Sequence, residues 1–272
     1  MEIIIDSTES NQKNDIKYNY SFTHITDVKL FPNIYQKEVV KRLEKWGIAN
    51  NMELVKYRYN INFDNKDLDQ FLLDFFNSKE VRNSFPGLSS IISSEEALGV
   101  IDKIKYKKLT TKSIDLNCFD VLYESGLVNK SSGYIKKDYE EYYEDILLSD
   151  KLKAALINEE AEFYSVFDEE LRNELIFSIF QKITIGGSLC QYEDYIQDYL
   201  DTTKLFYKDL VSAARDQTSK EIYIRSIAFE IKALNNLKLF KNEYNPQNFM
   251  ILTIDPYQRH VNVWLHKWVL FW

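Results

Sequence analysis

The chain has few of the residues that build disulfide scaffolds and metal centres. Among its 272 residues are two cysteines, Cys118 and Cys190, and three histidines, His24, His260 and His266. Two cysteines cannot supply a disulfide framework or a cysteine-based zinc site, so both are expected to be reduced thiols. Three histidines also leave little material for a catalytic base or a metal centre. The composition therefore argues weakly for an interaction protein over an enzyme.

Long apolar runs, glycine and proline are also scarce. No stretch approaches the roughly 18 apolar residues needed to cross a bilayer, so membrane insertion is not expected. The start of the chain lacks the basic region and the longer apolar core of a signal peptide. We therefore expect the protein in the cytoplasm or in a compartment continuous with it. With 7 glycines and 4 prolines, long flexible linkers are not expected either.

Positive charge is in the minority. Lys and Arg number 34 against 42 Asp and Glu, and the net charge is -8. A general nucleic-acid-binding protein needs a basic surface. Nucleic acid is therefore not an expected partner.

Apolar and aromatic residues, in contrast, are plentiful. They make up 45% and 15% of the chain, enough for a sizeable core. The pattern predicts a flexible leader over residues 1–16 and one α+β domain over 17–272. This domain is expected to be helix-rich in its first two thirds and strand-rich from about 182, with a mainly antiparallel sheet. The alternative is a jelly-roll-like sheet flanked by helices.

Hydrophobic periodicity assigns the individual elements. Helices are predicted at 34–47, 64–76, 114–124, 138–148 and 149–157, with a further helix capped by Asp168. Strands are predicted at 53–59, 101–108, 183–192, 204–213, 220–232, 249–254 and 260–271. In the last strand, alternation places His260, Asn262, Trp264 and His266 on one face and Val261, Val263 and Leu265 on the other.

No familiar catalytic motif emerges from these elements. The Gly186-Gly187 pair lacks the further glycines and the Gly-Lys-Ser/Thr of a phosphate loop, so it indicates a bulge or a tight entry to a strand. Glu193 and Asp194 are adjacent, so on a strand they would point to opposite faces. None of the histidines heads the His-x-carboxylate element of a non-haem iron site. No Gly-x-Ser-x-Gly nucleophile elbow is present.

An acidic and aromatic run, YEEYYED, occupies residues 139–145. Tyrosines supply contact area and carboxylates supply steering, so the run could dock a basic partner. An amphipathic helix with Tyr142, Tyr143 and Ile146 half buried is the interpretation that the spacing favours.

The most distinctive segment is 185–212, which carries more polar groups than a core requires. Its blocks, together with weaker ones elsewhere, are Gly186–Asp194 (GGSLCQYED), Tyr199-Leu200, Thr202–Lys204, Tyr207–Val211 (YKDLV), Arg42-Leu43, Lys45-Trp46, Phe75-Phe76, Ile254–Pro256 and Arg259-His260. In these blocks the chain resembles the cilia- and flagella-associated protein 300 family, from about Tyr18 onward.

The resemblance implies a role in motile cilia. It implies a non-catalytic factor, without a cofactor, that assembles outer and inner axonemal dynein arms or delivers them by intraflagellar transport. The implied partners are dynein assembly factors and chaperones, dynein arm subunits and the transport machinery, in the cytoplasm and in the motile cilium or axoneme. The alternatives are a stable axonemal component and an oxygenase-like jelly-roll enzyme, either active or degenerate.

The resemblance brings no residue-level binding site. The density of polar and aromatic side chains in the distinctive segment leads to the hypothesis that it forms part of a partner-binding face. The candidate residues are Gln191, Tyr192, Glu193, Asp194, Tyr199, Lys204, Tyr207, Lys208 and Asp209.

Overall fold

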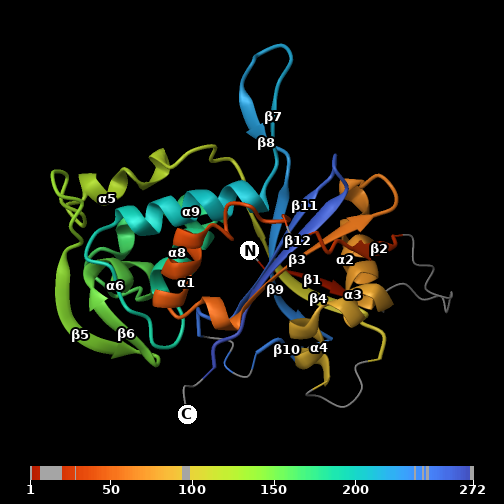
Figure 1. The fold of residues 1–272 in the computed structure, drawn as a ribbon, viewed down its shortest axis with the longest axis horizontal. Helices are drawn as coiled ribbons and strands as arrows, with labels where there is room; N and C mark the ends of the chain where they lie inside the picture. Colours follow the sequence, from red (N-terminus) through yellow and green to blue (C-terminus); the bar gives the residue numbers. More distant parts are fainter. Residues whose placement is uncertain are drawn as a thin grey trace.

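The computed structural model describes residues 2–6, 20–27, 29–93, 99–235, 237–240, 242 and 245–269. Its centre is an eight-stranded sheet in which every strand pairing is antiparallel (Figure 1). The spatial order is β1-β4-β9-β11-β12-β3-β2, and β10 pairs with β9. These strands are β1 (Glu2–Asp6), β2 (Phe22–His24), β3 (Met52–Tyr59), β4 (Lys103–Leu109), β9 (Ile227–Leu234), β10 (Leu237–Lys238), β11 (Phe249–Asp255) and β12 (His260–His266).

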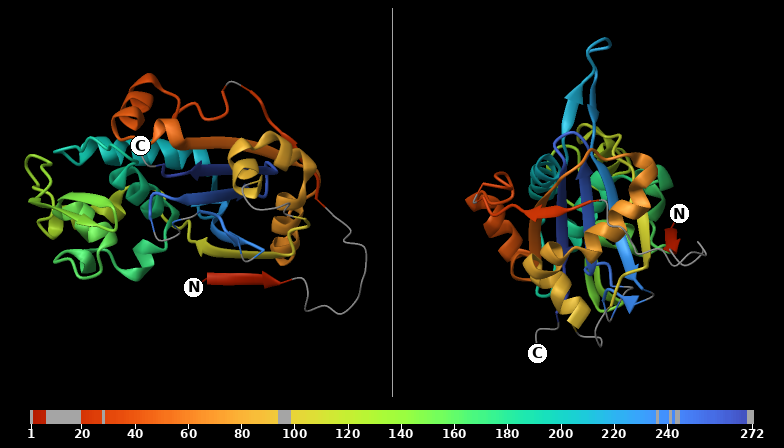
Figure 2. Two further views of the ribbon diagram at one scale, coloured as in Figure 1. Left: turned by 90° about the horizontal axis from the view of Figure 1, so that it is seen from below. Right: turned by 90° about the vertical axis from the view of Figure 1, so that its right-hand side faces the viewer.

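Helices cover both faces of this sheet (Figure 2). Their bounds are α1 (Lys37–Lys45), α2 (Leu68–Asn77), α3 (Lys79–Ser84), α4 (Pro86–Ser93), α5 (Val121–Glu124), α6 (Lys151–Ile157), α7 (Glu169–Arg172), α8 (Leu175–Ile185) and α9 (Gln197–Leu210). One apolar core joins α1, α8 and α9 to one face. A second core joins α2, α3 and α4 to the other face. The α+β prediction is confirmed, and the jelly-roll alternative is wrong, because the strands form one central sheet and not two facing ones.

The central strand β12 shows how the sequence produces two cores. Trp264 belongs to the core beneath α8 and α9, whereas Val261, Val263 and Leu265 belong to the core beneath α2. This is the predicted alternation of side chains between faces. Both faces are buried, so the polar residues of the strand, Asn262 and His266, are buried too.

Several predicted elements are confirmed. Helix α1 lies within 34–47, and α2 follows the Leu-Phe spacing of 64–76. Strands β3, β4 and β11 match the strands expected at 53–59, 101–108 and 249–254, and β12 confirms the one expected at 260–271 as far as His266. Asp168 caps α7, because its side chain accepts a hydrogen bond from the backbone N–H of Leu171. The range 114–124 is helical at its end, as a 3₁₀ turn and then α5.

The predicted strands 183–192 and 204–213 are wrong. The first range begins in α8, and most of the second lies in α9. The part of α8 that falls in the first range is its last turn, Ile183–Ile185, and all three residues are buried. A short, continuously apolar run has the same pattern as a buried strand. The strand-rich part therefore begins at Ala213 and not near 182.

The predicted helix over 138–148 is also wrong. Residues there form the hairpin of β5 (Lys137–Tyr143) and β6 (Ile146–Asp150). Its two-residue turn places Glu144 and Asp145 at φ values of 47° and 66°. Such turns usually contain Asn-Gly or Asp-Gly, and this one has neither, so the sequence gives no hairpin signal. The predicted helix 149–157 is confirmed as α6 from Lys151 onward.

Two further segments differ from the sequence-based expectation. Residues 2–6, placed in the predicted leader, form β1 and pair with β4, while 7–19 lie outside the described residues. The range 220–232 holds two strands. Strand β8 (Ile222–Ile224) pairs with β7 (Ala213–Arg215) in a hairpin that projects from the body (Figure 1), and β9 enters the sheet.

Candidate functional site

The distinctive segment begins where α8 ends. Gly186 has a φ of 73° and terminates the helix, a conformation that glycine adopts without steric cost. Next to it, the backbone of Gly187 lies against that of Gly47. The Gly187 N–H donates to the Trp46 carbonyl at 2.8 Å, and the Gln191 N–H donates to the Lys45 carbonyl at 2.9 Å. The glycine pair therefore allows a close approach between two loops, and the bulge or strand entry expected there is wrong.

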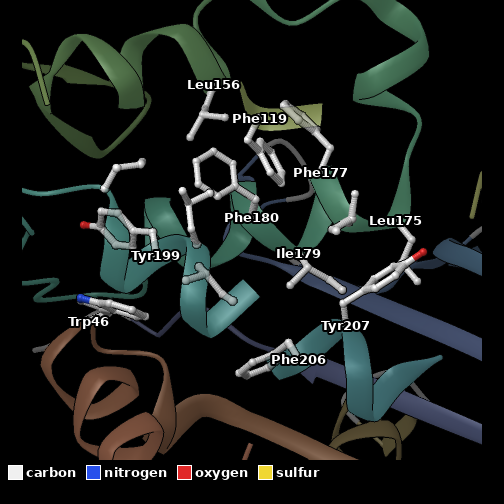
Figure 3. Close-up of a cluster of buried hydrophobic side chains, with 14 of the residues drawn as sticks. Trp46, Phe119, Leu156, Leu175, Phe177, Ile179, Phe180, Tyr199, Phe206 and Tyr207 are labelled. Atoms are coloured by element: carbon white, nitrogen blue, oxygen red, sulfur yellow. The ribbon is translucent and has the colours of Figure 1, made fainter. Parts of the chain in front are cut away.

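Glu193 is an acceptor inside this junction. Its carboxylate accepts hydrogen bonds from Lys45 Nζ at 2.8 Å and from Trp46 Nε1 at 2.9 Å. Its backbone N–H donates to the Tyr199 hydroxyl at 3.0 Å. Tyr199 is buried against Trp46, with ring centroids 4.9 Å apart (Figure 3). Glu193 and Tyr199 thus fix the loop to α1 and do not form a free binding face.

Tyr192 reaches in a different direction. Its hydroxyl donates to the Leu147 carbonyl at 3.2 Å, and Lys153 Nζ lies 3.2 Å from its ring centroid. Lys153 is fully buried and 3.6 Å from Asp150, and burial lowers the pKa of its ammonium group. Burial also raises the pKa of the Tyr192 phenol. The contact ties the segment to β6 and α6.

Asp194 points away from Glu193. Its carboxylate pairs with Lys137 Nζ at 2.6 Å, and hydrogen bonding to Lys137 lowers the pKa of the exposed Asp194 carboxyl. Its carbonyl accepts a hydrogen bond from the Ile135 N–H. The two neighbouring carboxylates therefore do not converge on one point, as expected from their adjacency, and they are not a paired acid and base.

The far end of the segment holds the chain before α1. The Asp209 carboxylate accepts hydrogen bonds from the backbone N–H groups of Asn33 and Ile34, both at 2.8 Å, and from Asn33 Nδ2 at 2.6 Å. Tyr207 is buried, and its hydroxyl donates to the Ser113 carbonyl at 2.8 Å (Figure 3). Both side chains stabilise the fold.

Replacing Asp209 with alanine should lower the free energy of unfolding by about 2 kcal/mol, because three donors around Asn33 lose a charged acceptor. Replacing the exposed neighbour Lys208 with alanine should change it by less than about 0.5 kcal/mol. Urea unfolding followed by circular dichroism measures both values. Equal midpoints for the two variants would show that Asp209 carries no such role.

The nine candidate residues therefore divide into two groups. Tyr192, Glu193, Tyr199, Tyr207 and Asp209 make internal contacts. The side chains of Gln191, Asp194, Lys204 and Lys208 are exposed. The structure does not gather all nine on one face.

Beside Asp194 lies a groove that the sequence did not indicate. It consists of two adjoining hollows of about 590 and 500 Å³ that share Tyr123 and Lys130. Tyr195 and Gln197, from the distinctive segment, line the first hollow, and Tyr134 lines the second. The groove joins the region from 120 to 137 with that from 195 to 197. No periodic signal links regions so far apart in sequence.

Tyrosines and lysines give this groove its chemistry. Tyr195 and Tyr134 are 56% and 39% exposed, and their rings meet edge to face with centroids 5.7 Å apart. Lys137 Nζ lies 5.8 Å from the Tyr134 ring and pairs with Asp194. Lys130 and Lys136 complete the wall of the second hollow. Exposed tyrosine rings are typical of protein-binding patches, and the lysines would lie at the polar rim of such a patch.

Comparison with known proteins places the chain in a family. The model of the family described as "Cilia- and flagella-associated protein 300" matches residues 19–266. The chain belongs to the cilia- and flagella-associated protein 300 family. A protein of that name from Paramecium tetraurelia is 39% identical over 272 residues, covering 100% of both chains. Another from Chlamydomonas reinhardtii is 29% identical over 239 residues, covering 86% of this chain and 93% of its own. No solved structure shows a significant match.

Membership of this cilium- and flagellum-associated family confirms the resemblance inferred from the distinctive segment. Within the described residues, no helix is long and apolar enough to cross a membrane. Within the same part of the chain, no group of three or more His, Cys, Asp and Glu side chains is arranged to hold a metal ion.

The two thiols of this family member are partly buried. Burial raises the pKa of both thiols, Cys118 and Cys190, to about 11. Both thiols are therefore protonated at neutral pH. His266 is almost fully buried, and burial lowers its pKa to about 4, so its ring is neutral. Its Nδ1 bonds to the Gln247 carbonyl and its ring stacks on Phe249, which are structural contacts.

Proposed function

We propose that the protein is a non-catalytic, cilium-associated factor for the assembly of outer and inner axonemal dynein arms or for their intraflagellar transport. Its partners would be dynein assembly factors with their chaperones, dynein arm subunits and the transport machinery. It would act in the cytoplasm and in the motile cilium. A binding role is supported by the tyrosine groove beside the distinctive segment. The loop of this segment that lines the groove is held in place from several sides.

The rigidity of the groove wall favours binding. The loop that carries Asp194 and Tyr195 is held through Glu193 to Trp46 and Lys45, and through Asp194 to Lys137. A partner that covers Tyr195 therefore does not have to order the loop, so less conformational entropy is lost on binding. Tyrosine adds large contact area with few rotatable bonds. The groove thus has the features of a preformed protein-binding site.

The partial burial of the two thiols and the full burial of His266 support a non-catalytic role. A nucleophilic cysteine needs a lowered pKa and access to substrate. Cys118 and Cys190 have raised values. His266 is held by Gln247 and Phe249 in the interior.

The decisive variant replaces Tyr134 and Tyr195 with alanine together. It would be expressed in a cell with motile cilia that lacks its own copy of the protein, and electron microscopy would record dynein arms on the axonemes. We expect arms to be lost or depleted and dynein subunits to fall out of the co-precipitate. Tyr257→Ala is the matched control, because Tyr257 is 77% exposed but lies in the turn between β11 and β12.

Normal arms and undiminished co-precipitation with the double variant would overturn the assignment to the groove. Normal arms in cells that lack the protein altogether would overturn the proposed function itself. Salt extraction of isolated cilia separates a carrier from a stable axonemal component. A carrier is released with the soluble fraction, and a stable component stays with the microtubules.

A further inference from the structure

The outer strand of the β5–β6 hairpin has an open edge. Among the described residues β5 pairs only with β6, and it lies on the outer side of the hairpin (Figure 1). Tyr143 opposes Ile146 across the two-residue turn, and Tyr142 opposes Leu147. The pairing is regular from Glu141 to Tyr143, and its register shifts between Lys137 and Glu141. In such a hairpin the first pair after the turn exchanges hydrogen bonds and the next does not. The backbone N–H and C=O of Tyr142 therefore face away from β6, as in any strand that can accept a further strand.

The inner strand anchors this edge to the body. Ile146 and Leu148 of β6 are 4% and 1% exposed and pack with Ala154 and Ile185. The Tyr192 hydroxyl also donates to the Leu147 carbonyl. The hairpin is thus a fixed platform and not a free arm, so a strand added to it would gain from a preformed template.

Two tyrosines of the open strand are highly exposed. Tyr142 lies in its regular part, and Tyr139 lies in the stretch where the register shifts, with its N–H donating to Asp138 Oδ1. Tyr139 is 92% exposed and Tyr142 is 76% exposed. The sequence favours a half-buried helix for this run, and the structure shows an exposed strand instead. Tyrosine side chains on a strand can cover the alternate side chains of an added strand.

Charge selects the kind of segment that fits. Asp138 pairs with Lys151 at the start of β5. In contrast, four carboxylates along the strand and its turn belong to no ion pair among the described residues: Glu140, Glu141, Glu144 and Asp145. An added strand that carried acidic residues would be repelled, and one that carried Lys or Arg would be attracted.

We propose that the open edge of β5 binds an extended, Lys/Arg-rich segment of a partner protein as an additional antiparallel or parallel strand. The open edge and the two exposed tyrosines form the surface, and the carboxylates determine the charge of the partner. This contact adjoins the tyrosine groove at Lys137 but uses different tyrosines and carboxylates. It stands or falls independently of the proposed function.

The test uses the full chain and synthetic eight-residue peptides. One peptide alternates lysine and valine, a second alternates glutamate and valine, and a third is the lysine peptide with every second backbone nitrogen methylated. Fluorescence anisotropy measures each affinity at low and at physiological salt. We expect the lysine peptide to bind and the glutamate peptide not to bind. Methylation should weaken binding of the lysine peptide at least about tenfold, because the methylated nitrogens cannot donate to a strand edge.

Variants connect the binding to β5. Glu140→Gln with Glu141→Gln, and separately Tyr139→Ala with Tyr142→Ala, should each weaken the lysine peptide about tenfold or more. The matched charge control is Glu159→Gln with Glu160→Gln, since both of those side chains are exposed in the turn after α6. This control and the groove variant Tyr134→Ala with Tyr195→Ala should bind the peptide as the unmodified chain does.

Three results would overturn the proposal. Equal affinity for the lysine and glutamate peptides would remove the charge selection. Equal affinity for the methylated and unmethylated peptides would replace strand addition by simple ionic attraction. A loss as large in the control as in Glu140→Gln with Glu141→Gln would place the contact elsewhere on the acidic surface.

Discussion

Replacing Gly187 with alanine is expected to lower the free energy of unfolding by about 3 kcal/mol, the upper range for overpacking a tight site. A Cβ at this position would overlap the backbone carbonyl of Gly47 and approach His266 Nε2 at 3.3 Å. A carbonyl that belongs to a helix-terminating turn cannot move aside as a flexible side chain can. Opening the contact would also lengthen the hydrogen bond from the Gly187 N–H to the Trp46 carbonyl. The junction between α1 and the distinctive segment would loosen.

Glycines elsewhere in the chain provide matched controls. Gly99→Ala should leave stability unchanged or raise it slightly, because no atom lies within 4 Å of the added Cβ. Gly47 and Gly126 both have positive φ values, 69° and 75°, but only Gly47 would meet a neighbouring backbone atom, the Ser188 carbonyl oxygen. The stability difference between Gly47→Ala and Gly126→Ala therefore isolates the contact from the backbone strain. Urea midpoints for Gly187→Ala and Gly99→Ala that agree would contradict the close-approach argument.

Elements with one strong local signal could be predicted from the sequence. The Leu-Phe spacing of α2, the cap at Asp168 and the alternation along β12 are each contained within a few residues. In each case the local pattern and the final burial agree. The alternation directly predicts that Trp264 and Val263 point to different faces of the sheet.

Elements whose identity depends on their surroundings could not be predicted. Helix α8 carries Ser178, Gln181 and Lys182 at helical spacing, but its last turn, Ile183–Ile185, is buried and reads Ile-Thr-Ile, which alternates as a strand would. The β5–β6 turn uses Glu144 and Asp145 at positive φ, where glycine or asparagine would have marked a hairpin. Ile146 and Leu148, on the strand that follows this turn, anchor the hairpin in a small apolar cluster that no local sequence signal reveals.

The candidate site shows the same division. The distinctive segment carries the family resemblance, but polar density alone does not distinguish a residue that binds a partner from one that stabilises the fold. Glu193 and Asp209 accept hydrogen bonds from α1 and from the turn before it. The exposed groove depends on Tyr134, which meets Tyr195 only after the chain has folded. The same segment can therefore both stabilise a loop and border a partner-binding surface.

The stability of the protein should fall steeply between pH 7.5 and pH 4.5, mainly because of the buried His266. Burial also lowers the pKa of the half-buried His260, which acts in the same direction. Burial, together with the charge of Lys182, lowers the pKa of His266 from 6.5 to about 4, against the opposing effect of its bond to Gln247. The unfolded chain binds a proton on this ring below pH 6.5, and the folded chain does so only near pH 4. The unfolded state therefore gains protons first, and stability decreases as pH falls. Linkage gives a loss of about 2.5 kcal/mol across this interval.

This pH interval separates the titration of His266 from that of the buried Glu230 carboxylate. Glu230 is held ionised by Lys182 and Lys232, and these charges lower its pKa to about 2 against its burial, so its stabilisation is lost only below about pH 4.5. His266→Phe keeps a ring stacked on Phe249 and removes the titrating nitrogen. Its unfolding free energy is lower at pH 7.5, since the Gln247 carbonyl loses a donor, but it should vary much less from pH 7.5 to 4.5. Parallel pH profiles for the two proteins, measured by urea unfolding, would show that the acid sensitivity arises from other groups.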